Sequence, residues 1–303
     1  MNPRPFLALL LVGCAHQPPV EEPTSAPEPG AEASEGYVIQ LQRRHEVGDR
    51  ARWEERIEEV KTQRMTVGGQ VVQEQASEVD GEVRATVEVR EVDDEGRVVR
   101  ADFTIELMRV DRDGEVTQLE PGSVVTVTRS ATGGGFAIGG APVDEATDEL
   151  IDLFFSKKSG GDVSSVFGST TPRQPGSSWP LDVDRFLVEF AGQGIPVELA
   201  RESVRGGAQF VAVEDLDGTE VLHLILGAEG QISSVRGMPG EVTGGSLTMS
   251  VDGLWPADGV SPQRGQTATI TMEMDVSGED PQAGPFTMHI GFGKKGTRSV
   301  TPL

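Results

Sequence analysis

Few residues of this chain have the types and spacing that catalysis or metal binding requires. Neither H-x-H nor H-E-x-x-H spacing, which would set two imidazoles on one metal ion, occurs among the four histidines, His16, His45, His223 and His289. A Gly-x-Ser-x-Gly elbow, which would expose a nucleophilic serine, is also absent. The sequence therefore predicts no catalytic residue, no cofactor site and no metal site, and we expect a protein that is not an enzyme.

Two Asp-x-Asp-Gly stretches, at 111–114 and 215–218, resemble the start of a calcium-binding loop. Both fall short of the D-x-D-x-D-G pattern with a later Glu that supplies a full set of oxygen ligands. Asp and Gly adopt the dihedral angles of tight turns at low cost. Each stretch therefore predicts a hairpin turn between two strands.

The chain has a single cysteine, Cys14, which follows a short apolar run at 6–12 preceded by Arg4. The run is too short to span a bilayer, which needs about 20 residues. The sequence at 11–14, Leu-Val-Gly-Cys, resembles the lipobox of bacterial lipoprotein signal peptides. That resemblance implies diacylglyceryl transfer to the Cys14 thiol and cleavage after residue 13. The alternative is a plain secretory signal with an incidental cysteine.

Residues 14–36 follow as an acidic segment that holds five prolines, five glutamates and no lysine or arginine. This composition favours an extended, self-repelling tether, and a binding tail is the less favoured alternative. In Gram-negative lipoproteins an Asp after the cysteine favours retention in the inner membrane. By this resemblance, Ala15 implies the outer membrane, with the protein facing the periplasm.

The net charge bears on possible partners. The chain carries 26 Lys and Arg against 49 Asp and Glu, a formal charge of −23. Phosphate backbones would repel so acidic a body, and this excludes nucleic acid as an expected partner. The expected partners are the membrane, through the lipid anchor, and a hydrophobic ligand or an envelope protein.

Beyond residue 36 the chain has the pattern of an all-β protein. Apolar and polar residues alternate over 83–89 and 99–107, which is typical of antiparallel strands with one wet face, and we expect residue 107 to point inward. Residues 50–64 stay ambiguous, since Trp53, Ile57 and Val60 have helical spacing. We expect a curved antiparallel sheet, or two sheets, built from two related halves at 37–170 and 171–303.

Two segments have helical patterns. One covers 143–156 and carries four apolar side chains on neighbouring faces, Leu150, Ile151, Phe154 and Phe155. The other starts after Asp182, a suitable N-cap. Because a sheet must cover its apolar face, we expect the first helix to lie over that face. It is either permanently packed there or a lid that glycine-rich flanks allow to open.

Three short motifs resemble a class of uncharacterised, β-rich bacterial lipoproteins. They are the Tyr-x-x-x-Leu strand at 37–41, the Gly-Asp step at 48–49 and the Pro-Gly-x-x-Trp step at 175–179. The class has no assigned activity, so the resemblance implies location and a β-rich fold. A helix covering a concave sheet also resembles the arrangement of Lol-type lipoprotein carriers.

The methionines at 249, 272, 274 and 288 fall on apolar strand faces, where they form either core or a deformable binding surface. We expect a membrane-anchored, non-enzymatic lipoprotein that binds a hydrophobic ligand or an envelope component. A structural or protein-interaction lipoprotein of the envelope is the alternative. An uncharted hydrolase is the third possibility.

Overall fold

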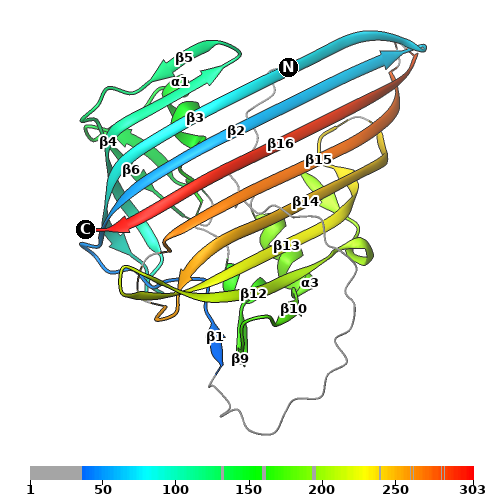
Figure 1. Cartoon of the computed structure of the whole chain (residues 1–303). Coiled ribbons are helices and arrows are strands. Elements are labelled where there is room, and N and C mark those ends of the chain that lie inside the picture. Colours follow the sequence, from blue (N-terminus) through cyan, green and yellow to red (C-terminus); the bar gives the residue numbers. More distant parts are fainter. Residues whose placement is uncertain are drawn as a thin grey trace, which may run out of the picture.

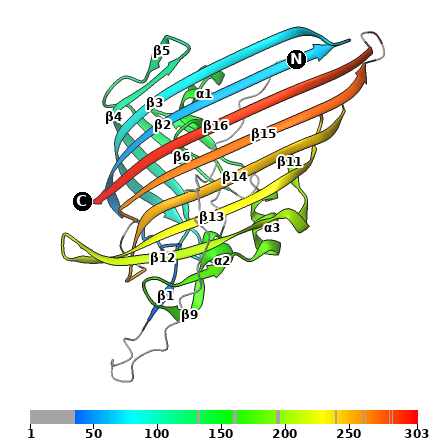
Figure 2. The ribbon, with the colours of Figure 1, turned by 45° about the vertical axis from the view of Figure 1, so that its right-hand side comes forward.

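The computed structural model describes residues 36–130, 133–158, 162–192, 196–238, 240–259, 261, 263–280, 282 and 284–303. Within these residues one antiparallel sheet of fourteen strands curves around three helices (Figures 1 and 2). Twelve strands cross the sheet in the order β10 (Ser178–Pro180), β12 (Arg205–Leu216), β13 (Thr219–Val235), β14 (Glu241–Pro256), β15 (Gly265–Asp280), β16 (Gly284–Pro302), β2 (Arg50–Val67), β3 (Gln70–Val92), β4 (Val98–Arg112), β6 (Val124–Thr128), β7 (Gly135–Ile138) and β8 (Ala141–Pro142). The expected all-β fold with minor α content is confirmed.

Four short strands complete the architecture. In the large sheet, β5 (Glu115–Gln118) pairs with β4, and β11 (Val197–Leu199) pairs with β13. β1 (Tyr37–Ile39) and β9 (Ser169–Arg173) form a separate two-stranded sheet. This small sheet ties the segment that follows the tether to the middle of the chain.

The ambiguous segment at 50–64 lies entirely within β2. This strand pairs with β16 on one side and β3 on the other, so its backbone polar groups are satisfied across the sheet rather than along a helix. Ile57 is buried on the inner face, whereas Val60, which helical spacing would place with it, is exposed. The β2–β16 pairing also joins the first and last long strands in the middle of the sheet.

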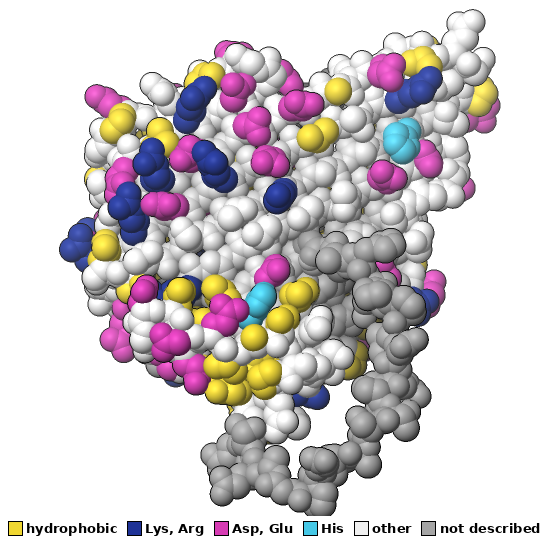
Figure 3. Space-filling model, in the orientation of Figure 1, with side chains coloured by type: hydrophobic (Ala, Val, Ile, Leu, Met, Phe, Trp, Pro, Cys, Tyr) yellow, Lys and Arg dark blue, Asp and Glu magenta, His cyan; other side chains and the backbone are white. Residues whose placement is uncertain are grey.

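The outer face of the central strands is charged. Figure 3 shows acidic and basic side chains interspersed over it, with apolar side chains mostly scattered singly. Cross-strand ion pairs such as Arg52 with Glu106 and Arg90 with Asp102 lie here. The outer face is therefore the wet one, and the apolar core lies on the inner face.

Both Asp-x-Asp-Gly stretches form the expected hairpin turns. Asp113 and Asp217 have positive φ angles of 53° and 55°, and a glycine with positive φ follows each. The first aspartate of each stretch accepts a hydrogen bond from the backbone N–H of that glycine, at 2.9 Å for Asp111 and 3.0 Å for Asp215. The acidic side chains thus stabilise the turns themselves.

The prediction that Leu107 points inward is wrong. Arg84 pairs with Leu107 while Ala85 pairs with Ile105, so Glu106 is an extra residue in β4 and forms a β-bulge. From this point the inward register moves by one position. Met108 is therefore fully buried, and Leu107 is only partly covered.

Three helices lie against the inner face: α1 (Glu145–Asp152), α2 (Val163–Phe167) and α3 (Val183–Gly192). α1 is shorter than the expected 143–156, because Asp144 caps its start by accepting from Thr147 N–H and the last turn loosens after Asp152. Asp182 accepts from Arg185 N–H at 3.0 Å, as expected for an N-cap of α3. α2 was not anticipated from the sequence.

Two apolar clusters fill the inner face. The α1 core joins α1 to β2, β3, β4 and β6, and the α2–α3 core joins those two helices to β12–β15. Val166 and Phe167 precede the expected boundary at residue 170 but belong to the α2–α3 core. The space between the two cores holds the candidate site.

Candidate functional site

A cavity of about 400 Å³ lies between the two cores. Phe103 and Phe154 of the α1 core contribute to its lining, and so do Phe190 and Met249 of the α2–α3 core. This volume is within the range of about 300–1,000 Å³ that is usual for sites of single small ligands. The cavity can therefore hold one molecule with an apolar body.

Residues 40–49, here called the strap, border the cavity and bridge the two halves of the fold. The backbone N–H groups of Leu41 and Gln42 both donate to Ser164 Oγ at 2.9 Å, which fixes the strap to α2. At its other end, His45 N–H donates to Gly96 O and Gly48 N–H to Val89 O. Side chains of the strap thereby reach the cavity from a fixed backbone.

The charge of the cavity lining is opposite to the charge of the protein. Its side chains include three carboxylates, Asp49, Glu55 and Glu189, and six cations, Arg43, Arg50, Arg129, Lys158, Lys294 and Arg298. The whole chain, in contrast, carries −23. A cationic interior in so acidic a protein is favourable for a negatively charged ligand group.

The centre of the polar lining is an ion pair between β2 and β16. Arg298 donates to both carboxylate oxygens of Glu55, through Nη2 at 3.0 Å and Nε at 3.1 Å. Trp53 Nε1 also donates to Glu55, at 3.2 Å, and the Arg298 guanidinium lies 4.3 Å from the centre of the Trp53 ring. Because Glu55 is only 3% exposed, this geometry is rigid and the charge of Arg298 is largely neutralised.

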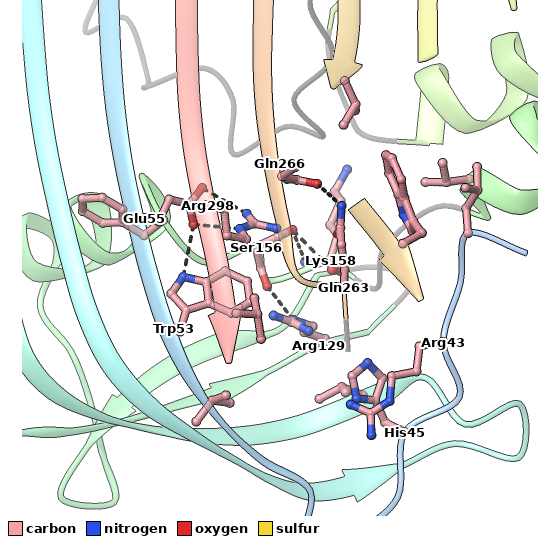
Figure 4. A pocket seen from close by; sticks show the side chains of 18 of the residues that line it. Arg43, His45, Trp53, Glu55, Arg129, Ser156, Lys158, Gln263, Gln266 and Arg298 are labelled. Atoms are coloured by element: carbon pink, nitrogen blue, oxygen red, sulfur yellow. Dashed lines mark hydrogen bonds and ion pairs between the residues drawn. The ribbon is translucent and has the colours of Figure 1, made fainter. Parts of the chain in front are cut away.

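Arg129 lies beside this pair and is bound differently (Figure 4). Its Nε donates to the backbone oxygen of Ser156 at 3.1 Å. In the part of the chain that the structure describes, no carboxylate forms an ion pair with it. Burial, together with the positive charge of Arg298, lowers the pKa of Arg129 to about 10. Arg129 remains a cation at neutral pH, but one without a neutralising partner.

The strap adds a second group of polar side chains. Arg43 forms an ion pair with Asp49 at 2.7 Å, and His45 Nδ1 lies 3.6 Å from the same carboxylate. Burial and the charge of Arg43 lower the pKa of His45 to about 4, against the opposing effect of Asp49. His45 is therefore neutral at physiological pH.

A further buried charge connects the sheet to the end of α1. Lys294 on β16 donates to the backbone oxygen of Leu153 at 3.4 Å and lies 3.9 Å from the Glu59 carboxylate. Glu59 also forms an ion pair with Lys61 at 2.5 Å. Burial lowers the pKa of Lys294. This group holds the segment after α1 against β16.

The four residues proposed as an apolar cover lie together. Leu150, Ile151, Phe154 and Phe155 are all buried in the α1 core. The Phe155 ring packs on Phe103 with centroids 4.1 Å apart, whereas Phe154 borders the cavity. Cys14, the proposed lipid-attachment residue, lies outside the described residues.

The other two histidines among the described residues, His223 and His289, lie on β13 and β16 and do not line the cavity. His223 pairs with Asp252 at 2.7 Å and with Glu214 at 3.3 Å, and His289 pairs with Asp275 at 2.9 Å. The described residues contain no group of three or more His, Cys, Asp or Glu side chains arranged to hold a metal ion. Nor do they include a helix long and apolar enough to cross a membrane.

Sequence reasoning missed the charged lining, although part of the signal was present. Glu55 and Glu59 alternate with Trp53 and Ile57, so a strand over this segment would place two carboxylates on the apolar face. A buried carboxylate is costly unless a cation pairs with it, so the pattern predicts cations nearby on the same face. The sequence gives no indication that Arg298 is the cation, nor that Arg129 joins it.

No family model matches the chain, and no curated protein matches it. Among solved structures, the fold has a weak similarity to a DUF1329 family protein from Desulfovibrio piger ATCC 29098. The sequence identity is 8%, the match covers 79% of this chain and 83% of that chain, and the TM-score is 0.12. At these values the similarity carries no argument about function, which has to be inferred from the site.

Proposed function

We propose that the protein is a lipid-anchored, non-enzymatic binding protein of the bacterial envelope that holds a hydrophobic ligand between its two cores. The cavity of about 400 Å³ carries this proposal, because aromatic and aliphatic side chains from both cores line it. An apolar ligand would cover surface that is otherwise left facing the cavity. Each 100 Å² of apolar surface removed from water contributes about 2.5 kcal/mol.

The expected anchor supports the same function. Acylation of Cys14 and the acidic tether at 15–36 would keep the folded body within reach of a membrane. Hydrophobic ligands are concentrated in membranes. A tethered body with an apolar cavity is therefore suited to take up such a molecule from the lipid phase.

The polar groups of the site favour binding over catalysis. Both oxygens of Glu55 accept hydrogen bonds, so this carboxylate is held as a partner of Arg298 rather than free to abstract a proton. His45 is neutral, but its Nδ1 lies at 3.6 Å from Asp49, longer than a hydrogen bond. This arrangement orients a ligand group more readily than it activates a nucleophile.

The binding of N-phenyl-1-naphthylamine, a neutral dye that fluoresces in apolar surroundings, tests this proposal. The full chain carrying Cys14→Ser avoids both an acyl chain and detergent. We expect saturable binding of one dye per chain, which Val251→Phe weakens because Val251 lines the cavity. Val60→Phe is the matched control, because Val60 is exposed. Absence of saturable binding, or equal weakening by both variants, contradicts the proposal and favours a structural or protein-interaction role.

A further inference from the structure

We propose that the ligand is an anionic amphiphile, a molecule with one apolar body and a carboxylate or phosphate group, and that Arg129 binds this anionic group. The inference rests on the proposed function, and it adds the chemical class of the ligand. Its basis is the contrast between Arg129 and the two other half-buried arginines of the lining, Arg43 and Arg298, which both bind carboxylates.

Three of the six cations have an acidic partner, namely Arg43, Lys294 and Arg298. Of the others, Arg50 is exposed and Lys158 donates to the backbone oxygen of Gly192 at 3.0 Å. Arg298 is neutralised by Glu55 through two hydrogen bonds, and Arg43 by Asp49 at 2.7 Å. Arg129 instead donates to the backbone oxygen of Ser156, and its charged neighbour is Arg298, which has the same sign. A partly buried guanidinium without a counter-charge is costly, and an oxyanion would supply the missing charge.

The backbone around Arg129 is fixed before any ligand binds. Its own N–H donates to Val99 O at 2.7 Å, which continues the pairing of β6 with β4. Next to it, Ser130 N–H donates to Lys157 O at 3.3 Å. The backbone of Arg129 is therefore fixed directly after β6, a strand paired on both sides, and no backbone entropy has to be lost when its side chain binds an anion.

The position of Arg129 within the cavity indicates an amphiphile rather than a free ion. Figure 4 shows it below the Glu55–Arg298 pair, with Arg43 and His45 further along the same side. The rest of the lining is largely apolar and includes Phe154, Phe190 and Trp255. An anion bound at Arg129 would leave most of the cavity empty unless an apolar body were attached to it.

Displacement of N-phenyl-1-naphthylamine from the Cys14→Ser chain distinguishes the alternatives. The competitors are dodecanoate, dodecyl phosphate and dodecanol, which share an apolar chain and differ in charge, and inorganic phosphate, which has no chain. We expect both anionic amphiphiles to displace the dye at about tenfold lower concentration than dodecanol, since a charge-assisted hydrogen bond contributes on this order. Inorganic phosphate is expected to leave the dye bound.

Arg129→Gln is the decisive variant. It should abolish the advantage of the anionic amphiphiles while leaving the affinities for the dye and for dodecanol unchanged, and unchanged dye affinity shows that the cavity is intact. Arg56→Gln is the matched control, because that side chain is 76% exposed on β2. Should Arg129→Gln perturb the fold, Arg129→Lys, which retains the charge, is expected to retain the advantage.

The failures of the two proposals are separable. If the dye binds but dodecanol competes as well as the anionic amphiphiles, the anionic ligand class is wrong while the binding function stands. If inorganic phosphate displaces the dye at millimolar concentration, the ligand is a soluble oxyanion, and the proposal of an amphiphile is wrong. If the dye does not bind, the proposed function itself is contradicted.

Discussion

Truncation of Phe155, which follows the end of α1, should test whether α1 and the turn after it are a permanent part of the core. The side chain is 1% exposed, and its ring lies 4.1 Å from that of Phe103 and 6.2 Å from that of Trp53. Phe→Ala changes in cores cost about 3–5 kcal/mol, and aromatic pairs add about 0.5–1.5 kcal/mol to area burial. We expect Phe155→Ala to lower the free energy of unfolding by about 4–5 kcal/mol.

Phe154→Ala should cost less, about 2–4 kcal/mol, although Phe154 is also buried. Its ring borders the cavity, so truncation enlarges a space that already exists and removes fewer contacts. If α1 opens as a lid, this variant should also take up more hydrophobic dye while the body stays folded. A permanently packed helix should instead keep the binding of a single dye in the cavity, with no further dye bound until the whole chain unfolds.

Urea unfolding followed by tryptophan fluorescence and far-UV circular dichroism measures these costs. Val188→Ala serves as the control, because that side chain is 65% exposed on α3 and should change stability by less than about 0.5 kcal/mol. Suppose Phe155→Ala lowers the free energy of unfolding by less than about 1.5 kcal/mol, and the slope of this free energy against urea concentration is unchanged. That result would refute the assignment of α1 to the core.

Three further predictions concern other parts of the chain. Cys14→Ser should abolish labelling by an alkyne fatty acid and release the protein from membranes; retained label would show that Cys14 is not the anchor. The pKa of His45 is about 4 in the folded chain and 6.5 without perturbation, so the unfolded chain takes up a proton first. The contribution of His45 to the free energy of unfolding should therefore be complete above pH 6.5 and should fall by about 1–2 kcal/mol as the pH drops toward 4. This range is reduced for solvent screening, because the His45 side chain is 32% exposed. His45→Asn should remove this part of the pH dependence, and equal pH profiles would contradict the assignment. Gly81→Ala should destabilise by about 1–3 kcal/mol, because its Cβ would lie 2.7 Å from both Ile57 Cγ1 and Phe154 Cζ, whereas a control Gly293→Ala meets no atom within 4 Å.

Local features of this protein are predictable from its sequence because they depend on neighbouring residues. The turns at 111–114 and 215–218 form because Asp and Gly accept positive φ angles and the first Asp bonds the glycine N–H. The N-cap at Asp182 and the burial of the apolar side chains of α1 follow from similarly short patterns. Alternation also predicts the second half of β3 in part and most of β4, but the bulge at Glu106 has no comparable signal in the sequence.

The segment that forms β2 shows where a local sequence pattern cannot predict the secondary structure. Over 50–64 the spacing of Trp53, Ile57 and Val60 suits a helix as well as a strand. Pairing with β16 makes the segment a strand, and this partner lies more than 200 residues further along the chain. A pattern within one segment carries no information about such a partner.

The candidate site depends on the same non-local pairing. Glu55 and Arg298 are 243 positions apart, and they meet because β2 and β16 lie side by side in register. Arg129, the residue after β6, lies beside this pair although it is more than 70 positions from Glu55 and more than 160 from Arg298. The sequence by itself determined the strand faces, the turns and the expected anchor. The tertiary structure decided which charges share the cavity and that Arg129 lies there beside Arg298 rather than beside a carboxylate, because period-two alternation assigns a side chain to a face but not to a neighbour.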